Sequence, residues 1–130
     1  NLTEAALLTD TPYQETPDEA YLKTLLEKLL VFGAKGVVIT GINWDEKTIG
    51  FAGMEREKGV FTYKAERIPR QLHGTGDMFC AVTLGALTKG NTLEEAAAQA
   101  ARFVEKVVLA TPVSTPFGAN FEEALPLLIK

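Results

Sequence analysis

Apolar residues recur along the chain at two spacings, and each spacing predicts a different kind of element. Between residues 20 and 32, leucines stand three or four positions apart, as they do on the buried face of an amphipathic helix. Thr16 is expected to cap this helix, because Pro17 at the first position and Glu19 at the third complete a capping box. The β-branched run 37–40 predicts a strand covered on both faces, with Thr40 at its carboxyl end.

Turns and caps place the remaining elements. The extended segments 48–54 and 60–65 flank a charged turn that ends in Gly59, which predicts a β-hairpin. The apolar run 78–87 is long enough for a buried helix. A second capping box at Thr92 begins a helix that should end at Thr111-Pro112. Shorter helices are expected near the two ends of the chain, at 2–9 and 121–129.

Composition and charge narrow the class of protein. Hydrophobic residues make up 46% of the sequence and charged residues 23%, proportions that fit one globular domain. The formal net charge of −4 argues against nucleic-acid partners and anionic membranes, so any phosphate site should be local. Cys80 has no second cysteine to pair with and lies in an apolar run, where we expect it to be buried. The sequence has no apolar stretch of membrane-spanning length, and we expect a cytoplasmic protein.

The stretch best suited to chemistry is Gly74-Thr75-Gly76-Asp77, directly before the apolar run 78–87. The first N–H groups of a helix have no partner within the helix and lie at the positive end of its dipole, which favours an anion. Glycines let a phosphate approach the backbone closely. Asp77 repels such a phosphate, but a base beside a phosphoryl group has a use for that position. The alternative stays open, because Asp is also favoured in a first turn as a cap or dipole partner.

Two motifs carry a resemblance to a known family. His73-Gly74-Thr75-Gly76-Asp77 resembles the G-T-G-D signature of the ribokinase-like (PfkB-type) small-molecule kinases, and Asn1-Leu2-Thr3-Glu4 resembles their N-x-x-E segment. The surrounding sequence is most similar to pyridoxal kinases. The resemblance implies an α/β fold of three layers, α/β/α, here its C-terminal half with a central, mostly parallel sheet and a β-hairpin. Residues 1–130 are then the C-terminal nucleotide-binding part of a single kinase domain whose N-terminal part is missing, and inactive alone.

The same resemblance implies how the G-T-G-D residues act. Asp77 is expected to take the proton from the substrate hydroxyl. The backbone amides of Gly74, Thr75 and Gly76 are expected to form an anion hole for the ATP phosphates. His73, which precedes them, is expected to line the nucleotide pocket rather than to act as the base.

Four residues elsewhere in the chain have roles implied by the resemblance. Thr40 and Asn1 are expected near the ATP phosphates, and Val113 in the nucleotide pocket. Glu4 is expected to organise Mg²⁺ through water. Two local alternatives stay open, because Glu4 also suits the first turn of a short helix and the Thr40 hydroxyl can be satisfied within its own strand.

The activity implied is transfer of the ATP γ-phosphoryl group, with Mg²⁺, to the primary hydroxyl of pyridoxal, a step of vitamin B6 salvage. Hydroxymethylpyrimidine kinase is the nearest alternative, although many members of that group have Cys where this sequence has Asp77. A sugar or nucleoside kinase of the superfamily and a non-catalytic ligand-binding relative are the others. The expected partners are ATP and a small pyridine or pyrimidine alcohol, and the resemblance implies a homodimer for the full-length protein.

Overall fold

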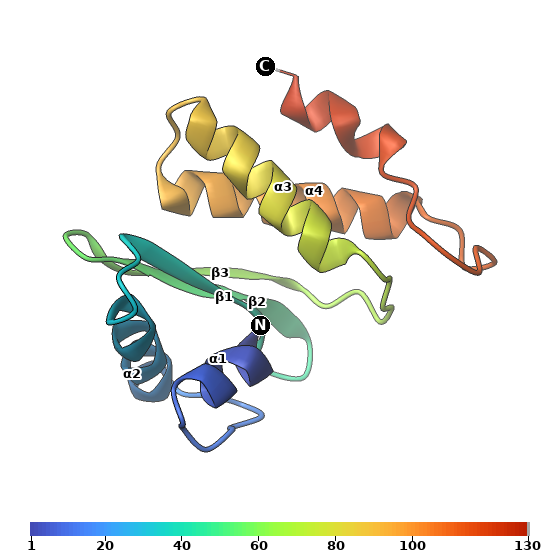
Figure 1. Cartoon of the computed structure of the whole chain (residues 1–130). Helices are drawn as coiled ribbons and strands as arrows, with labels where there is room; N and C mark the ends of the chain where they lie inside the picture. The colour runs from blue at the N-terminus through green and yellow to red at the C-terminus, as the bar shows by residue number, and fades with distance from the viewer. Residues whose placement is uncertain (130) are drawn as a thin grey trace. The chain divides into compact units, whose positions relative to one another are not determined.

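The computed structural model describes residues 1–129, which form two compact units with the boundary between Arg67 and Ile68. The first unit contains α1 (Leu2–Leu8), α2 (Glu19–Leu30), β1 (Gly36–Asn43), β2 (Thr48–Glu55) and β3 (Gly59–Glu66). The second contains α3 (Thr75–Thr88), α4 (Leu93–Ala110) and the 3-10 helix η1 (Glu122–Leu128) (Figure 1).

In the first unit, α1 and α2 cover one face of a three-stranded sheet with the order β1-β2-β3 (Figure 1). The leucine spacing that predicted α2 places its apolar stripe in the core, where Leu25 and Leu26 are fully buried with Ile39 and Ile42. The predicted hairpin is confirmed, because β2 and β3 pair along their whole length from Thr48↔Glu66 to Glu55↔Gly59. The sheet and its two helices therefore form a core of their own.

The three strands do not form the mostly parallel sheet that was expected. Both strand pairs are antiparallel. The links 44–47 and 56–58 are short, and a parallel pair needs a crossover of about a dozen residues or more. The sequence between β1 and β3 therefore permits only antiparallel neighbours.

The expected boundaries of β1 and α2 also need correction. β1 continues past Thr40 to Asn43, and only Ile39 and Ile42 are buried in it, so the strand is not covered on both faces. The N-cap of α2 is Asp18 rather than Thr16: its Oδ1 accepts a hydrogen bond from the Tyr21 N–H (2.7 Å). Asp is at least as good an N-cap residue as Thr, so the sequence offers two caps of similar strength. The helix uses Asp18, the one closer to its apolar stripe.

In the second unit, α3 packs against α4 and η1 packs against α4. The capping box at Thr92 is confirmed: the Thr92 N–H donates to Glu95 Oε2 (2.9 Å) and the Glu95 N–H to Thr92 Oγ1 (3.2 Å). The last helix is 3-10 rather than α-helical. Pro126 lies inside it and has no N–H to donate, which disfavours a continuous α-helix.

α3 begins at Thr75, as the motif predicted, but it is not a buried helix in this chain. Only Val82 and Ala86 are buried in it, whereas Leu84 is 64% exposed. Cys80 is exposed as well, so its expected burial was wrong. The helix is apolar on every side, and within its unit α4 covers only one of those sides.

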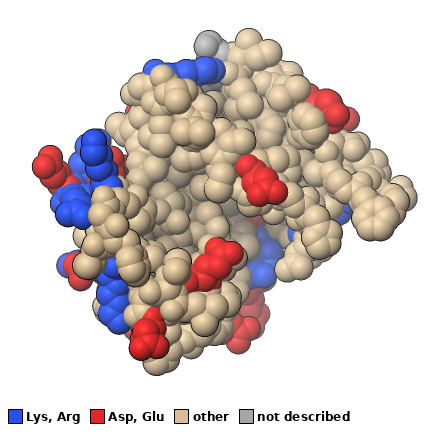
Figure 2. All heavy atoms as spheres, in the orientation of Figure 1, with Lys and Arg blue, Asp and Glu red and all other residues tan. Residues whose placement is uncertain are grey.

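Two surface properties bear on possible partners. None of the helices within residues 1–129 combines the length and apolar character needed to cross a bilayer. On the face that Figure 2 shows, acidic and basic side chains are interspersed, without a broad basic field.

Candidate active site

The turn that begins α3 carries the G-T-G-D residues. The Met78 N–H donates the first helical hydrogen bond to the Gly74 carbonyl oxygen (3.0 Å), and the N–H groups of residues 75–77 precede it. Side chains cap the other three α-helices, from Asn1 on α1, Asp18 on α2 and Thr92 on α4. No side chain in the described part of the chain caps α3. Its first N–H groups therefore lack the side-chain acceptor that the other three helices have, which leaves them suited to an anion.

The two glycines of this turn differ in what the fold requires of them. Gly74 adopts a left-handed conformation with φ of 87°, which glycine reaches without steric cost. Gly76 lies inside α3 without a positive φ, and a Cβ placed there would meet nothing within 4 Å in the described chain. The fold thus explains the glycine at 74, and the glycine at 76 has no structural requirement.

Asp77 and His73 are both exposed beside this turn. The carboxylate of Asp77 therefore does not point into a core, and it lies in the first turn of α3 next to the uncapped N–H groups. The Thr75 hydroxyl points back along the chain, where Oγ1 donates to the Leu72 carbonyl oxygen (3.4 Å). The exposed carboxylate of Asp77 thus lies beside the first N–H groups of α3.

Asn1 and Glu4 form a capping box at the start of α1. The Glu4 N–H donates to Asn1 Oδ1 (3.0 Å), and the backbone nitrogen of Asn1 donates to Glu4 Oε2 (2.6 Å). Glu4 is therefore an exposed carboxylate that supports the first turn of α1.

Thr40 lies in a bulge of β1 rather than at the end of the strand. The pairing with β2 shifts register between Ile39 and Ile42, and Gly41 in the shift has a φ of 69°. A Cβ on Gly41 would lie 3.8 Å from the Cβ of Asn1. The first unit therefore brings Asn1 and the Thr40-Gly41 bulge together, with Glu4 on the adjoining turn.

The other candidate residues lie in the second unit. Figure 1 shows that α3 begins at the end of the α3–α4 pair where α4 finishes. The G-T-G-D turn and the loop after α4 share that end, and Val113 in the loop is 91% exposed. Sequence reasoning missed Arg70, whose guanidinium connects these two segments. Its partners are backbone carbonyls 38 to 42 residues further along, and no side-chain pattern signals them.

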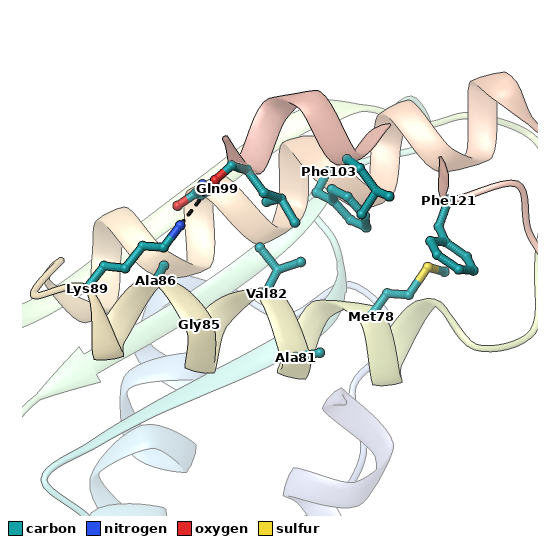
Figure 3. A pocket seen from close by; sticks show the side chains of 11 residues that line it. Met78, Ala81, Val82, Gly85, Ala86, Lys89, Gln99, Phe103 and Phe121 are labelled. Atoms are coloured by element: carbon teal, nitrogen blue, oxygen red, sulfur yellow. Dashed lines mark hydrogen bonds between the residues drawn. The ribbon is translucent and has the colours of Figure 1, made fainter. Parts of the chain in front are cut away.

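A pocket of about 290 Å³ lies on the helical layer of the second unit (Figure 3). Its lining is mostly apolar, with Val82 of α3, Phe103 of α4 and Phe121 before η1 facing the hollow. The one cation in the lining, Lys89, donates from Nζ to the Leu128 carbonyl oxygen (3.2 Å). Gly74, Gly76 and Asp77 do not line it, so this pocket is separate from the turn that begins α3.

Comparison with known proteins assigns the family. The model of the family described as phosphomethylpyrimidine kinase matches residues 1–120. The chain belongs to the phosphomethylpyrimidine kinase family. Its α/β architecture is that of the ribokinase-like kinases, as expected, with the antiparallel three-stranded sheet as the part of that fold seen here.

Members and neighbours of this family include enzymes for two substrates. Over 81 residues the chain is 36% identical to the hydroxymethylpyrimidine/phosphomethylpyrimidine kinase of Staphylococcus aureus (strain MSSA476), covering 62% of this chain and 29% of the relative. A protein of Bacteroides thetaiotaomicron assigned as a phosphomethylpyrimidine kinase matches all of this chain and 46% of its own, with a TM-score of 0.92 and 28% identity. The same protein was also crystallised with pyridoxal.

A pyridoxal kinase is also among the family's structural neighbours. The crystal structure of pyridoxal kinase from Lactobacillus plantarum has a TM-score of 0.82 and 33% identity, over 99% of this chain and 48% of that one. The chain thus spans less than half the length of each kinase named here.

Proposed function

We propose that this chain is the nucleotide-binding part of an ATP-dependent kinase that phosphorylates the primary hydroxyl of pyridoxal. The observation that carries the proposal is that no side chain in the described chain caps the first N–H groups of α3, with an exposed Asp77 beside them. Phosphoryl transfer needs an aligned acceptor and compensation for charge on the γ-phosphate more than it needs covalent help from the protein. Free amides and a nearby carboxylate supply these two needs.

The residues of the turn divide the work of the reaction. The N–H groups of residues 75–77 donate to the γ-phosphate oxygens at the positive end of the α3 dipole. Asp77 accepts the hydroxyl proton as the alcohol oxygen forms its bond to the γ-phosphorus, and the bond from that phosphorus to the β–γ bridging oxygen breaks. ADP leaves with the electron pair of that bond. His73 and Val113 lie at the same end of the second unit and are proposed to contact the nucleotide.

Mg²⁺ fits the first unit through Glu4. Magnesium is usually held by one or two carboxylates together with substrate phosphates and water. Glu4 is an exposed carboxylate in the first turn of α1, and Asn1, which caps that turn, lies beside the Thr40-Gly41 bulge. Held there, Mg²⁺ would supply positive charge.

The proposal includes further chain beyond these residues. The kinases named above are more than twice as long as this chain. Several apolar or small side chains of α3 are uncovered, including Leu84, Leu87 and Cys80. A helix that is apolar on all sides is stable only when other protein covers it. Residues 1–130 alone are therefore expected to lack activity, and kinetic tests belong to the full-length protein.

Hydroxymethylpyrimidine is the second candidate substrate, because the curated relative from Staphylococcus aureus acts on it by name. We rank pyridoxal first for two reasons. Many hydroxymethylpyrimidine kinases have Cys at the position of Asp77, and the similar Bacteroides protein was crystallised with pyridoxal. Both acceptors present a primary alcohol on a flat heteroaromatic ring. The chemistry at the turn is the same for either.

A substrate panel tests the proposed function. ADP release by the full-length protein is measured in a coupled assay with ATP, Mg²⁺ and one acceptor at a time: pyridoxal, hydroxymethylpyrimidine, ribose and a nucleoside. We expect the highest kcat/KM with pyridoxal. A preference for hydroxymethylpyrimidine would favour the second candidate. Absence of acceptor-dependent ADP release would exclude a kinase.

Gly76→Ala is expected to separate anion binding from folding. The added Cβ meets open space in the described chain and favours a helix, so the thermal midpoint should stay the same or rise, with a gain of at most about 1 kcal/mol. The same Cβ obstructs a phosphate that lies against the turn, so kcat/KM for ATP should fall by about tenfold or more. The measurements are steady-state kinetics and thermal unfolding of the same preparation.

The matched control for this variant is Gly85→Ala. Gly85 lies in the same helix, away from the turn, and its added Cβ also meets open space in the described chain. It should stabilise the helix equally and leave the kinetics unchanged. Wild-type kinetics in Gly76→Ala would remove the anion role from this glycine.

A further inference from the structure

Arg70 holds the end of α4 through three backbone carbonyls. Its Nη1 donates to the carbonyl oxygens of Val108 (3.4 Å) and Thr111, and its Nη2 donates to that of Pro112 (2.5 Å). Arg70 is half-buried and lies in the segment that leads into the G-T-G-D turn. One side chain thus joins the approach to the turn with the segment where α4 becomes a loop.

The physical basis of this contact is strong. The last carbonyls of a helix have no N–H partner within it and lie at the negative end of its dipole. A guanidinium carries five donors in a rigid plane and a permanent positive charge. It therefore pairs at once with the Val108 carbonyl, one of the last of α4, and with the Thr111 and Pro112 carbonyls just beyond the helix. Lysine, with a compact ammonium, cannot reproduce that planar arrangement.

Thr111 closes the loop that follows. It is 2% exposed, and its Oγ1 donates to the Val107 carbonyl oxygen (2.7 Å) while accepting from the Asn120 N–H (2.8 Å). The loop 112–119 is therefore fixed at both ends, at its start by Arg70 and across its base by the Thr111 hydroxyl. Between those ends, Val113 is 91% exposed.

We propose that Arg70 is a positioning residue that sets the loop 112–119 relative to the phosphate-binding turn, with Thr111 as its partner at the base of the loop. This inference rests on the proposed function in one respect, that the loop contacts the nucleotide while the turn binds its phosphates. Arg70 itself touches neither. Its role is to fix how far the nucleoside contact lies from the phosphate contact, and so to determine the affinity for ATP.

The structural part of the proposal is tested by hydrogen exchange on the full-length protein. Arg70→Met keeps the aliphatic stem and removes all donors, and the amides of residues 111–120 should then exchange at least about tenfold faster, while those of the middle of α4 stay protected. Thr111→Val is nearly isosteric and should accelerate the Asn120 amide in particular, whereas Thr111→Ser should restore it. Arg102→Met, an exposed arginine on α4, is the control and should change none of these amides. Unchanged exchange in both Arg70→Met and Thr111→Val would overturn the proposal.

The functional part is tested by kinetics of the full-length protein. Arg70→Met should raise the KM for ATP by about tenfold and alter the KM for the alcohol and the kcat much less, because the chemical groups stay in place. Arg70→Lys should recover only part of the loss. Equal effects on both KM values, or a loss confined to kcat, would contradict the positioning role. If the wild-type protein releases no ADP with any acceptor, the proposed function fails, and hydrogen exchange still decides the role of Arg70 in fixing the loop.

Discussion

Asp77→Asn is expected to lower kcat by about 10²- to 10⁴-fold, the usual contribution of a positioned general base. Asparagine has nearly the same shape as aspartate but does not accept the hydroxyl proton, so the acceptor alcohol would have to attack without assistance. The affinity for ADP should stay the same or increase, because a negative charge beside the bound phosphates is removed. Steady-state kinetics of the full-length protein and calorimetric binding of ADP measure the two effects.

The control for this variant is Glu94→Gln. Glu94 is an exposed acid in the first turn of α4, just as Asp77 is in the first turn of α3. Each substitution removes a negative charge that favours the start of a helix, an effect of about 0.3–1 kcal/mol on stability. Glu94→Gln should therefore reproduce the small stability change and keep full turnover. Turnover near the wild-type level in Asp77→Asn would show that another group accepts the proton.

The elements predicted most accurately are those specified by residues close together in the sequence. The Thr92 capping box joins residues three apart, and the hairpin turn needs only Gly59, which adopts a φ of 81°. The start of α3 is equally local, because Gly74 supplies the left-handed N-cap. In each of these cases the decisive contact lies within a few residues of the signal.

Predictions that depended on distant parts of the chain were less successful. The β-branched run of β1 suggested burial on both faces, and the apolar run of α3 suggested burial all round. Each pattern shows that the side chains of a segment are apolar. It does not show which other part of the protein covers them. The bulge at Thr40-Gly41 could not be predicted from the sequence of β1, because a register shift depends on how β1 pairs with β2.

The candidate site shows the same division. The helix start at the G-T-G-D residues could be predicted from sequence because the turn and its helix are contiguous, and the anion binding expected there stays a prediction. The contact of Gly41 with Asn1 and the contacts of Arg70 with the end of α4 join residues far apart in the chain. Sequence alone gives no sign of these, since one side of each contact is backbone or a residue without charge.

Gly50→Ala is expected to destabilise the first unit by about 3 kcal/mol or more, because it forces an atom into a closed space. Gly50 lies in the central strand β2 between Ile42 and Lys64. A Cβ there would lie 1.8 Å from the Tyr63 carbonyl oxygen and 2.9 Å from Trp44 Nε1. The carbonyl belongs to the neighbouring strand, so it cannot retreat without opening the ladder. It also accepts the hydrogen bond from Trp44 Nε1 (3.0 Å), which would be lost.

Trp44 is the only tryptophan in the sequence, so its fluorescence reports directly on this corner of the sheet during urea unfolding. Gly59→Ala is the matched control: its Cβ has open space in the described chain, and only the positive φ of 81° is unfavourable. A left-handed conformation costs an alanine about 1–2 kcal/mol. The steric effect at Gly50 should therefore exceed the conformational effect at Gly59. Equal losses of stability in the two variants would mean that β3 moves away from β2 more easily than their hydrogen-bonded pairing suggests. Close packing against Tyr63 would then not be the reason for glycine at position 50.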